Sequence, residues 1–164
     1  MARVPGRMRR AKSIQLIVPA IAILALAGGC GGGKEQVSAA ELVQNGDQIC
    51  RDEQSKFNQI QAQPPANASD AADQTKDLVT AAEDANSSLD DLEPPDALKD
   101  SYENYLDARD RAIDQIKRGQ DAAENQDSRA YGAAQAAVVN SAPQRRKLAA
   151  SLGLKVCSSN PGSV

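Results

Sequence analysis

Residues 71–92 read AADQTKDLVTAAEDANSSLDDL, and their apolar positions recur at alternating steps of four and three residues. The positions that repeat are Ala71, Thr75, Leu78, Ala82, Ala85, Leu89 and Leu92. This spacing places one apolar stripe along a helix and is typical of the seam between antiparallel helices. The stretch therefore predicts a long amphipathic helix and an all-α fold built from helices of this kind.

A pair of prolines flanks the stretch on each side. Gln63-Pro64-Pro65 precedes it and Glu93-Pro94-Pro95-Asp96 follows it. Proline donates no backbone hydrogen bond and pushes the preceding residue towards an extended conformation, so both pairs end helices. Asn67 or Ser69 can cap the helix that begins between them.

The segment before the first proline pair predicts another helix. Ser38-Ala39-Ala40-Glu41 has the form of a capping box, which marks a helix start at Ser38. The apolar stripe that follows comprises Ala39, Leu42, Val43, Gly46, Ile49, Cys50, Phe57 and Ile60. Cys50 lies on this stripe and should point inward.

Two further helices are expected after the second proline pair. The first starts near Asp96, and the turn that follows it is expected within residues 120–127. The second starts at Ser128, is kinked or split at Pro143, and ends at Gly153. Four helices with short turns favour an up-down-up-down four-helix bundle. We expect the bundle to span residues 38–157 and residues 158–164 to form a disordered tail.

The chain contains no histidine, and this excludes several classes of site. Ser-His-Asp and Cys-His nucleophile systems, His-ligated haem and the Glu-x-x-His motif of di-iron bundles all require it. An acidic group near the second proline pair lacks the spacing of a calcium loop and is interpreted as a solvated helix end. We therefore expect no metal, no cofactor and no enzymatic activity.

The N-terminal region has the organisation of an export signal. It is basic up to Lys12, then apolar from Ile14 to Ala27, and it ends in Leu26-Ala27-Gly28-Gly29-Cys30. The ending resembles the lipobox of bacterial lipoproteins, in which small residues precede a cysteine that receives diacylglycerol. The resemblance implies that residues 1–29 are a cleaved signal peptide and that lipidated Cys30 anchors the protein to the membrane through a flexible tether, residues 30–37.

Two other interpretations of this region stay open. Ala25-Leu26-Ala27 also fits an ordinary signal peptidase site, which would release a secreted protein that starts at Gly28. A retained transmembrane anchor is disfavoured, because the apolar run has about 14 residues and a spanning helix needs about 20. Most lipoboxes carry leucine three places before the cysteine, where this chain has Ala27.

Lipidation of Cys30 leaves Cys50 and Cys157, an even number in an oxidising compartment. We expect them to form one disulfide; the alternative is two unpaired buried thiols. The antiparallel bundle agrees with the disulfide, because the end of its fourth helix returns beside the start of its first.

Loss of the signal lowers the number of Lys and Arg residues from 19 to 14, against 22 Asp and Glu residues, which gives a net charge of −8. This charge disfavours nucleic acid as a partner.

Arg109 is the candidate binding residue, because it falls on the inward stripe of the third helix beside Tyr102 and Tyr105. It could receive an anionic ligand or pair with a buried carboxylate, and the tyrosines could line a pocket beside it. Alternatively, the arginine stem packs while its head reaches water, and the tyrosines fill the core.

Beyond the lipobox, the chain resembles small exported helical lipoproteins, especially actinobacterial ones. The residues that carry this resemblance are the Leu92-Glu93-Pro94-Pro95 turn, followed by Tyr102 and Tyr105, and the late Leu152-Gly153-Leu154-Lys155-Val156-Cys157. We expect a lipid-anchored, non-enzymatic protein of the cell envelope that contacts another envelope protein. A module that binds a small ligand between the helices is the alternative.

Overall fold

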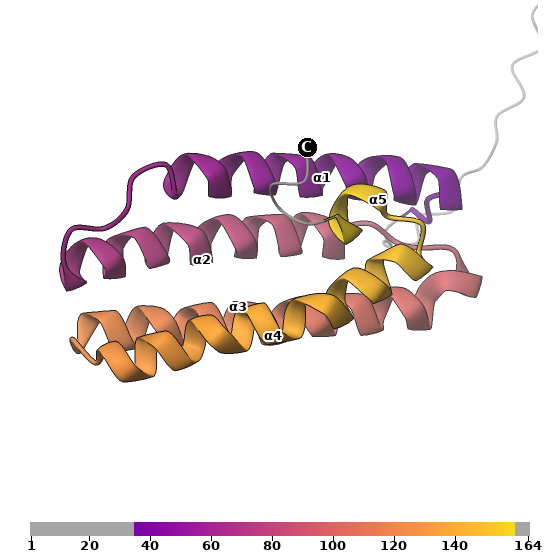
Figure 1. Cartoon of the computed structure of the whole chain (residues 1–164). Helices are drawn as coiled ribbons and strands as arrows, with labels where there is room; N and C mark the ends of the chain where they lie inside the picture. The colour runs from indigo at the N-terminus through magenta and orange to yellow at the C-terminus, as the bar shows by residue number, and fades with distance from the viewer. Residues whose placement is uncertain (1–34, 160–164) are drawn as a thin grey trace, which may run out of the picture. The chain divides into compact units, whose positions relative to one another are not determined.

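The computed structural model describes residues 35–159, in which four long helices are followed by one short helix. The long helices are α1 (Ala39–Ile60), α2 (Ala68–Asp90), α3 (Lys99–Glu124) and α4 (Ser128–Ser151), and the short helix is α5 (Lys155–Ser158). Successive long helices run in opposite directions (Figure 1). The expected all-α, up-down-up-down bundle is confirmed. The signal peptide, Cys30 and residues 160–164 lie outside the described residues.

The helix starts follow the local chemistry of the sequence. Ser38 and Glu41 form the predicted capping box, and the hydrogen bonds from Ser38 lower the pKa of the Glu41 carboxyl. Asn67, rather than Ser69, caps α2 by accepting a hydrogen bond from the Asp70 amide at 3.0 Å. Asp127 caps α4 in the same way. Each cap satisfies a backbone donor that the helix itself leaves unpaired.

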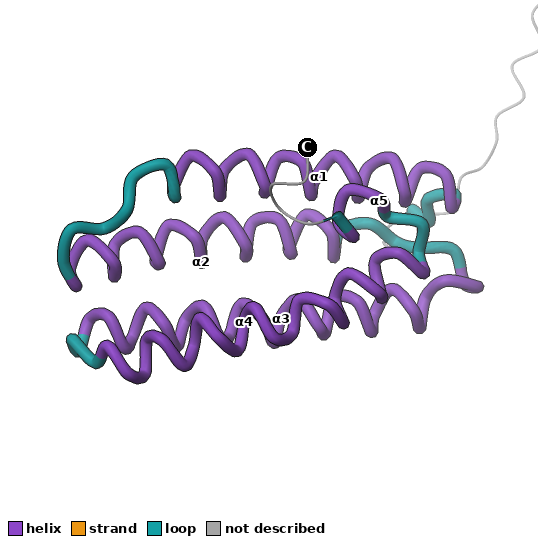
Figure 2. The backbone as a smooth tube through the Cα atoms, in the orientation of Figure 1, coloured by secondary structure: helices purple, strands orange, loops and turns teal. Residues whose placement is uncertain are grey.

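A glutamine side chain stabilises the connection between α1 and α2. Gln74 Nε2 donates to the carbonyl of Ile60 at 2.9 Å and to that of Gln63 at 2.8 Å. The first is a carbonyl in the last turn of α1, which has no partner within the helix. The proline-containing loop, drawn in teal between α1 and α2 in Figure 2, is thereby fixed to α2.

Residues immediately before α1 are attached to the bundle. The Val37 amide donates to the carbonyl of Glu93 at 2.9 Å, and Gln36 Nε2 donates to the carbonyl of Pro94 at 3.1 Å. We expected both residues to belong to the flexible tether that spans residues 30–37, and the structure corrects this for Gln36 and Val37. The second proline pair is the cause, because its extended backbone offers carbonyls to a neighbouring segment.

The turn between α3 and α4 lies within residues 120–127, as the polar composition of this stretch suggested. It occupies only the last part of the stretch, because α3 continues to Glu124. Ala122 and Ala123 are both buried, and burial of these methyl groups favours continuing the helix. Only residues 125–127 connect the two helices.

Pro143 does not split α4, which is one helix from Ser128 to Ser151. A proline inside a helix removes one backbone hydrogen bond and displaces carbonyls of the preceding turn. Side chains supply donors there: Ser141 Oγ donates to the Val138 carbonyl at 3.0 Å, and the Arg145 guanidinium approaches the same oxygen at 3.5 Å. The carbonyl that loses its helical donor at Pro143 is that of Val139, so these contacts stabilise the adjacent carbonyl of the displaced turn.

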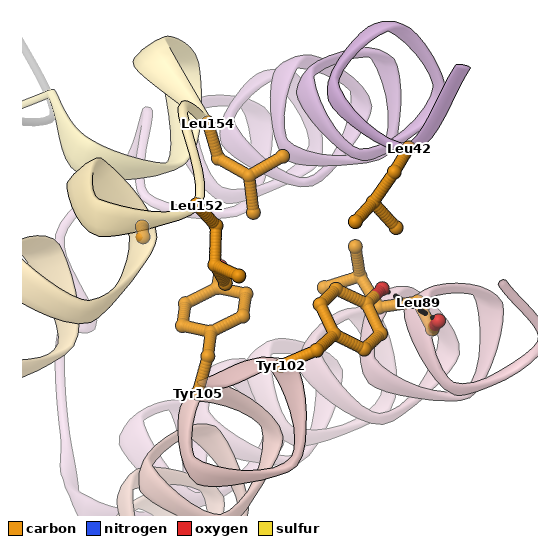
Figure 3. Packing of buried hydrophobic residues seen from close by; sticks show 7 residues of the cluster. Leu42, Leu89, Tyr102, Tyr105, Leu152 and Leu154 are labelled. Atoms are coloured by element: carbon orange, nitrogen blue, oxygen red, sulfur yellow. Dashed lines mark hydrogen bonds between the residues drawn. The ribbon is translucent and has the colours of Figure 1, made fainter. Parts of the chain in front are cut away.

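The largest apolar residues gather near the end of the bundle that carries α5. The cluster contains Leu42, Leu89, Tyr102, Tyr105, Ala149, Leu152 and Leu154 (Figure 3). It draws on α1, α2, α3, α4 and the segment between α4 and α5. Elsewhere the buried side chains are mostly alanines, so the helices there bury little area for each residue.

α5 joins the first and last long helices. α3 packs against α2 and α4, α1 packs against α2 and α5, and α4 packs against α3 and α5. The buried residues of α1 are Leu42, Gly46, Asp47 and Cys50, all within its first 12 residues. The position of α1 therefore depends both on α2 and on residues 154–159, which we call the C-terminal segment.

Candidate functional site

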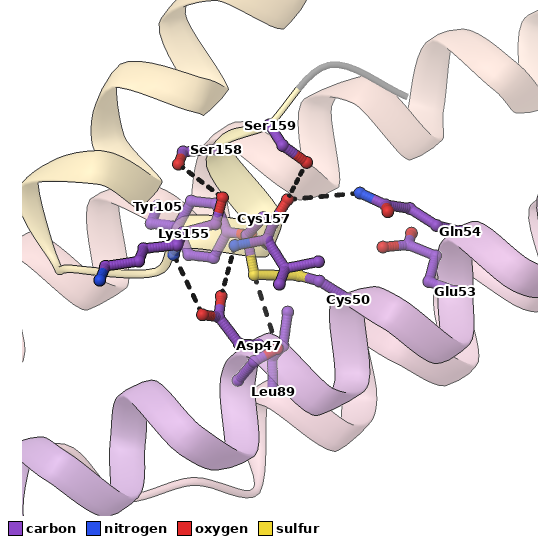
Figure 4. Close-up of a disulfide and its surroundings, with 12 residues drawn as sticks. Asp47, Cys50, Glu53, Gln54, Leu89, Tyr105, Lys155, Cys157, Ser158 and Ser159 are labelled. Carbon is purple, nitrogen blue, oxygen red and sulfur yellow. Dashed lines mark hydrogen bonds between the residues drawn. A yellow bond between two sulfur atoms is a disulfide. The ribbon is translucent and has the colours of Figure 1, made fainter. Parts of the chain in front are cut away.

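A disulfide joins α1 to the C-terminal segment. Cys50 and Cys157 are bonded at an S–S distance of 2.09 Å, with their Cα atoms 5.3 Å apart and 107 positions apart in sequence (Figure 4). The predicted pairing is confirmed. Cys50 is buried, and the hydroxyl of Tyr105 lies 3.8 Å from its sulfur.

The end of α4 directs the chain back towards this disulfide. Gly153 adopts a φ of 82°, a conformation that glycine reaches without steric cost. The Leu154 amide donates to the Ala149 carbonyl and the Gly153 amide to the Ala150 carbonyl, both at 3.0 Å. This is a Schellman motif, and Gly153 is the helix stop that the sequence predicts.

Asp47 holds the start of α5. Its carboxylate accepts hydrogen bonds from the Val156 amide at 2.8 Å and from the Lys155 amide at 3.2 Å (Figure 4). Gln54 Nε2 donates to the Val156 carbonyl at 3.3 Å. Although α5 is only one turn long, side chains of α1 therefore bind two of its backbone amides and one of its carbonyls. Ser158, which we expected in a disordered tail, is the last residue of α5.

Leu154 occupies space that Gly46 leaves open. Leu154 is fully buried, and a Cβ atom added at Gly46 would lie 2.7 Å from its Cδ2 atom. That distance is shorter than van der Waals contact allows. The missing side chain at Gly46 is therefore what lets the C-terminal segment pack directly on α1.

We expect the effect of Gly46→Ala to change sign with the residue at position 154. In the wild-type chain it should destabilise by about 1–3 kcal/mol through overpacking. In a Leu154→Ala background, which alone should cost about 2–5 kcal/mol, the added methyl should fill part of the cavity and restore stability. Urea unfolding of all four chains measures the coupling. Additive effects at the two positions would contradict the packing described.

Arg109 lies in a largely buried ion pair. Its Nη2 donates to Glu53 Oε1 at 2.9 Å, and the side chains are 12% and 13% exposed. Its Nε donates to Asn86 Oδ1 at 2.9 Å, and the guanidinium lies 5.9 Å from the ring centre of Tyr105. Of the interpretations left open by the sequence, the structure therefore favours the buried carboxylate pair.

Electrostatics keep the arginine charged in this position. Burial by itself lowers the pKa of Arg109, but the Glu53 carboxylate and Tyr105 outweigh it, and the net pKa is raised. Arg145 of α4 lies close enough to be affected: burial and the charge of Arg109 lower its pKa. Glu53 therefore pairs with Arg109, which is the more buried of the two neighbouring arginines Arg109 and Arg145.

Tyr102 and Tyr105 fill the core instead of lining a cavity. They are 1% and 2% exposed, their ring centres lie 6.4 Å apart, and burial raises both pKa values. The Tyr102 hydroxyl donates to the Leu89 carbonyl at 2.7 Å (Figure 3). Arg109, Tyr102 and Tyr105 do lie together, as the sequence suggested, but their polar groups have partners inside the fold.

An open groove lies instead between α1 and α2, with a volume of about 450 Å³. It is lined by Ile49, Asp52, Glu53, Ser55, Lys56, Ala81, Asp84, Ala85 and Ser88. The groove shares Glu53 with the buried ion pair. Its outer residues include an ion pair between Lys56 and Asp84 at 3.6 Å, with side chains 54% and 63% exposed.

Sequence reasoning did not single out Glu53, Asp47 or Asn86. A signal for Glu53 was present, because the apolar stripe of the first helix has a gap of seven residues between Cys50 and Phe57, and Glu53 fills the missing position. An acidic residue at an inward position predicts a basic partner on another helix. Asp47 and Asn86 carry no such signal, since their partners are set by tertiary packing.

Within residues 35–159, no cluster of acidic or cysteine side chains is arranged to hold a metal ion. None of the helices in the described part of the chain combines the length and apolar character needed to cross a bilayer.

No protein-family model, no curated protein and no solved structure matches the chain.

Proposed function

We propose that this is an exported protein, anchored by lipid at Cys30 on the extracytoplasmic side of the cell membrane. The observation that carries the proposal is the Cys50–Cys157 disulfide. Structural disulfides persist in oxidising compartments and are rare in the cytosol of ordinary cells. Pairing of these two cysteines leaves Cys30 as the remaining thiol, at the end of a signal that resembles a lipobox.

We further propose that the tethered bundle acts by contacting another envelope protein and not by catalysis. The candidate polar groups support this, because Arg109, Tyr102 and Asp47 are engaged within the fold. We place the contact surface in the groove between α1 and α2. A protein held at the membrane meets its partners at raised effective concentration, so a modest contact area suffices.

Replacing Cys30 with alanine should move the protein from the membrane fraction to the medium. The thiol that accepts the lipid would be absent, so the mature chain would have no hydrophobic anchor. Immunoblotting of fractions, together with incorporation of a palmitate analogue, measures both consequences. Ser38→Ala, which leaves the signal unchanged, is the control.

Two results would reject the lipid anchor. One is a wild-type protein that is found only in the medium and whose mass is that of an unlipidated chain starting at Gly28, which indicates ordinary secretion. The other is an unchanged membrane fraction after the Cys30 substitution.

For the partner, crosslinking in native membranes should recover one defined envelope protein, and repeated failure to do so would count against a contact role.

A further inference from the structure

The groove between α1 and α2 is formed by matching faces of the two helices. Ile49, Asp52, Glu53 and Lys56 follow one another on α1 at i, i+3, i+4 and i+7, and Ala81, Asp84, Ala85 and Ser88 do so on α2. Ala81 and Ala85 are buried, and Ile49 is half-buried. These three residues supply an apolar floor. The alanines leave open the volume that larger side chains would have filled.

Negative charge surrounds this floor. Asp52, Glu53 and Asp84 line the groove, against the single cation Lys56. Arg109 binds Glu53 from the inside of the bundle and so fixes the carboxylate at the groove wall. Figure 4 shows Glu53 one turn after Cys50, on the part of α1 that the disulfide holds. The position of the carboxylate is therefore determined by the core and not by the occupant.

The cation already in the groove is weakly held. Lys56 pairs with Asp84 at 3.6 Å, and more than half of each side chain is exposed. Exposed pairs of this kind contribute little, because water screens the charges and both side chains lose conformational freedom. Another cation with better apolar contact can therefore displace Lys56 at low cost.

We propose that the groove binds a lysine or arginine side chain presented by a partner protein. The aliphatic stem would lie on Ile49, Ala81 and Ala85, and the charged end would lie among Asp52, Glu53 and Asp84 after displacing Lys56. This inference rests on the proposed contact function and names its surface. The net charge of −8 after signal removal also attracts a basic segment over distance.

The shape of the groove favours a side chain over a free molecule. The groove has a volume of about 450 Å³ and is open to solvent, so an occupant keeps one side exposed. Small-molecule sites of this volume usually enclose most of their ligand. A side chain attached to a partner's backbone needs no such enclosure, because the rest of its contacts lie outside the groove.

Binding of blocked pentapeptides with a central lysine, arginine or glutamine tests the proposal. The full-length exported protein, purified in non-ionic detergent, is titrated and followed by NMR of methyl groups. The basic peptides should shift Ile49, Ala81 and Ala85 but not Val139, which is exposed on α4. Asp52→Asn and Asp84→Asn should each weaken binding about threefold or more, whereas Lys56→Gln should tighten it by up to about fivefold.

Matched variants separate this site from general attraction between charges. Asp121→Asn and Lys147→Gln change the net charge equally but lie at exposed positions on α3 and α4, and they should leave affinity within about twofold. The proposal is overturned if they act like Asp52→Asn and Lys56→Gln, or if none of the peptides binds at millimolar concentration. It is also overturned if free 1,5-diaminopentane binds as tightly as the lysine peptide.

Failure here is distinguishable from failure of the proposed function. Fractionation of the Cys30 variant and recovery of a crosslinked partner do not depend on the groove. A partner that remains crosslinked to the Asp52→Asn, Asp84→Asn double variant as efficiently as to the wild type would keep the contact function and remove the groove from it.

Discussion

Replacing both Cys50 and Cys157 with alanine is expected to lower the free energy of unfolding by up to about 4–5 kcal/mol. The bond closes a loop of 107 positions, and the chain-entropy model assigns a loss of this size to a loop of that length. The melting temperature should fall on the order of 10–20 °C. Thermal and urea unfolding of the double variant, in comparison with the wild type, measure the effect.

Reduction provides the matched control. The reduced wild-type chain should resemble the double alanine variant, and reductant should not change the stability of that variant. If the reduced protein keeps its full stability, the hydrogen bonds of Asp47 and the burial of Leu154 would suffice to hold the C-terminal segment. The disulfide would then contribute little.

Arg109→Met is expected to destabilise the bundle by about 3–5 kcal/mol. The substitution leaves the carboxylate of Glu53 buried at 13% exposure without its charged partner. Removal of one member of a buried pair costs this much because the remaining charge has lost its compensation. The amide oxygen of Asn86 loses a hydrogen-bond donor as well. Urea unfolding measures the change.

Two further variants test the physical reason. Arg109→Met combined with Glu53→Leu should recover most of the loss, because apolar groups can replace a buried pair at little cost. Lys117→Met breaks the pair between Lys117 and Glu83, whose side chains are 47% and 49% exposed, and it should lower the free energy of unfolding far less than Arg109→Met does, because water screens exposed charges. Equal losses for Arg109→Met and Lys117→Met would contradict the buried pair.

The helices and the disulfide could be predicted from the sequence because their causes are local or covalent. The capping box at Ser38 and the proline pairs after Gln63 and Glu93 fix where α1 and α2 begin and end. The alternating repeat in residues 71–92 places the buried face of α2. Assignment of Cys30 to the proposed lipid, together with antiparallel helices, predicted that Cys50 and Cys157 pair, and they do.

Predictions from local composition were correct in outline but not in detail. Residues 120–127 do contain the turn, but burial of Ala122 and Ala123 lets α3 continue to Glu124, so the turn takes up only residues 125–127. Pro143 was expected to kink or split its helix, and it does not split α4. Packing against neighbouring helices explains the first difference, whereas side chains of α4 itself supply donors beside the proline.

Tertiary structure alone decided how the polar side chains are used. Arg109 could be placed on an inward stripe from the sequence, but Glu53 and Asn86 become its partners only because α1 and α2 pack beside α3. The groove, likewise, exists because the buried alanines of α2 face α1 without filling the space between them. Local spacing determines which face of a helix is buried, whereas the partner of a buried charge depends on how all the helices pack together.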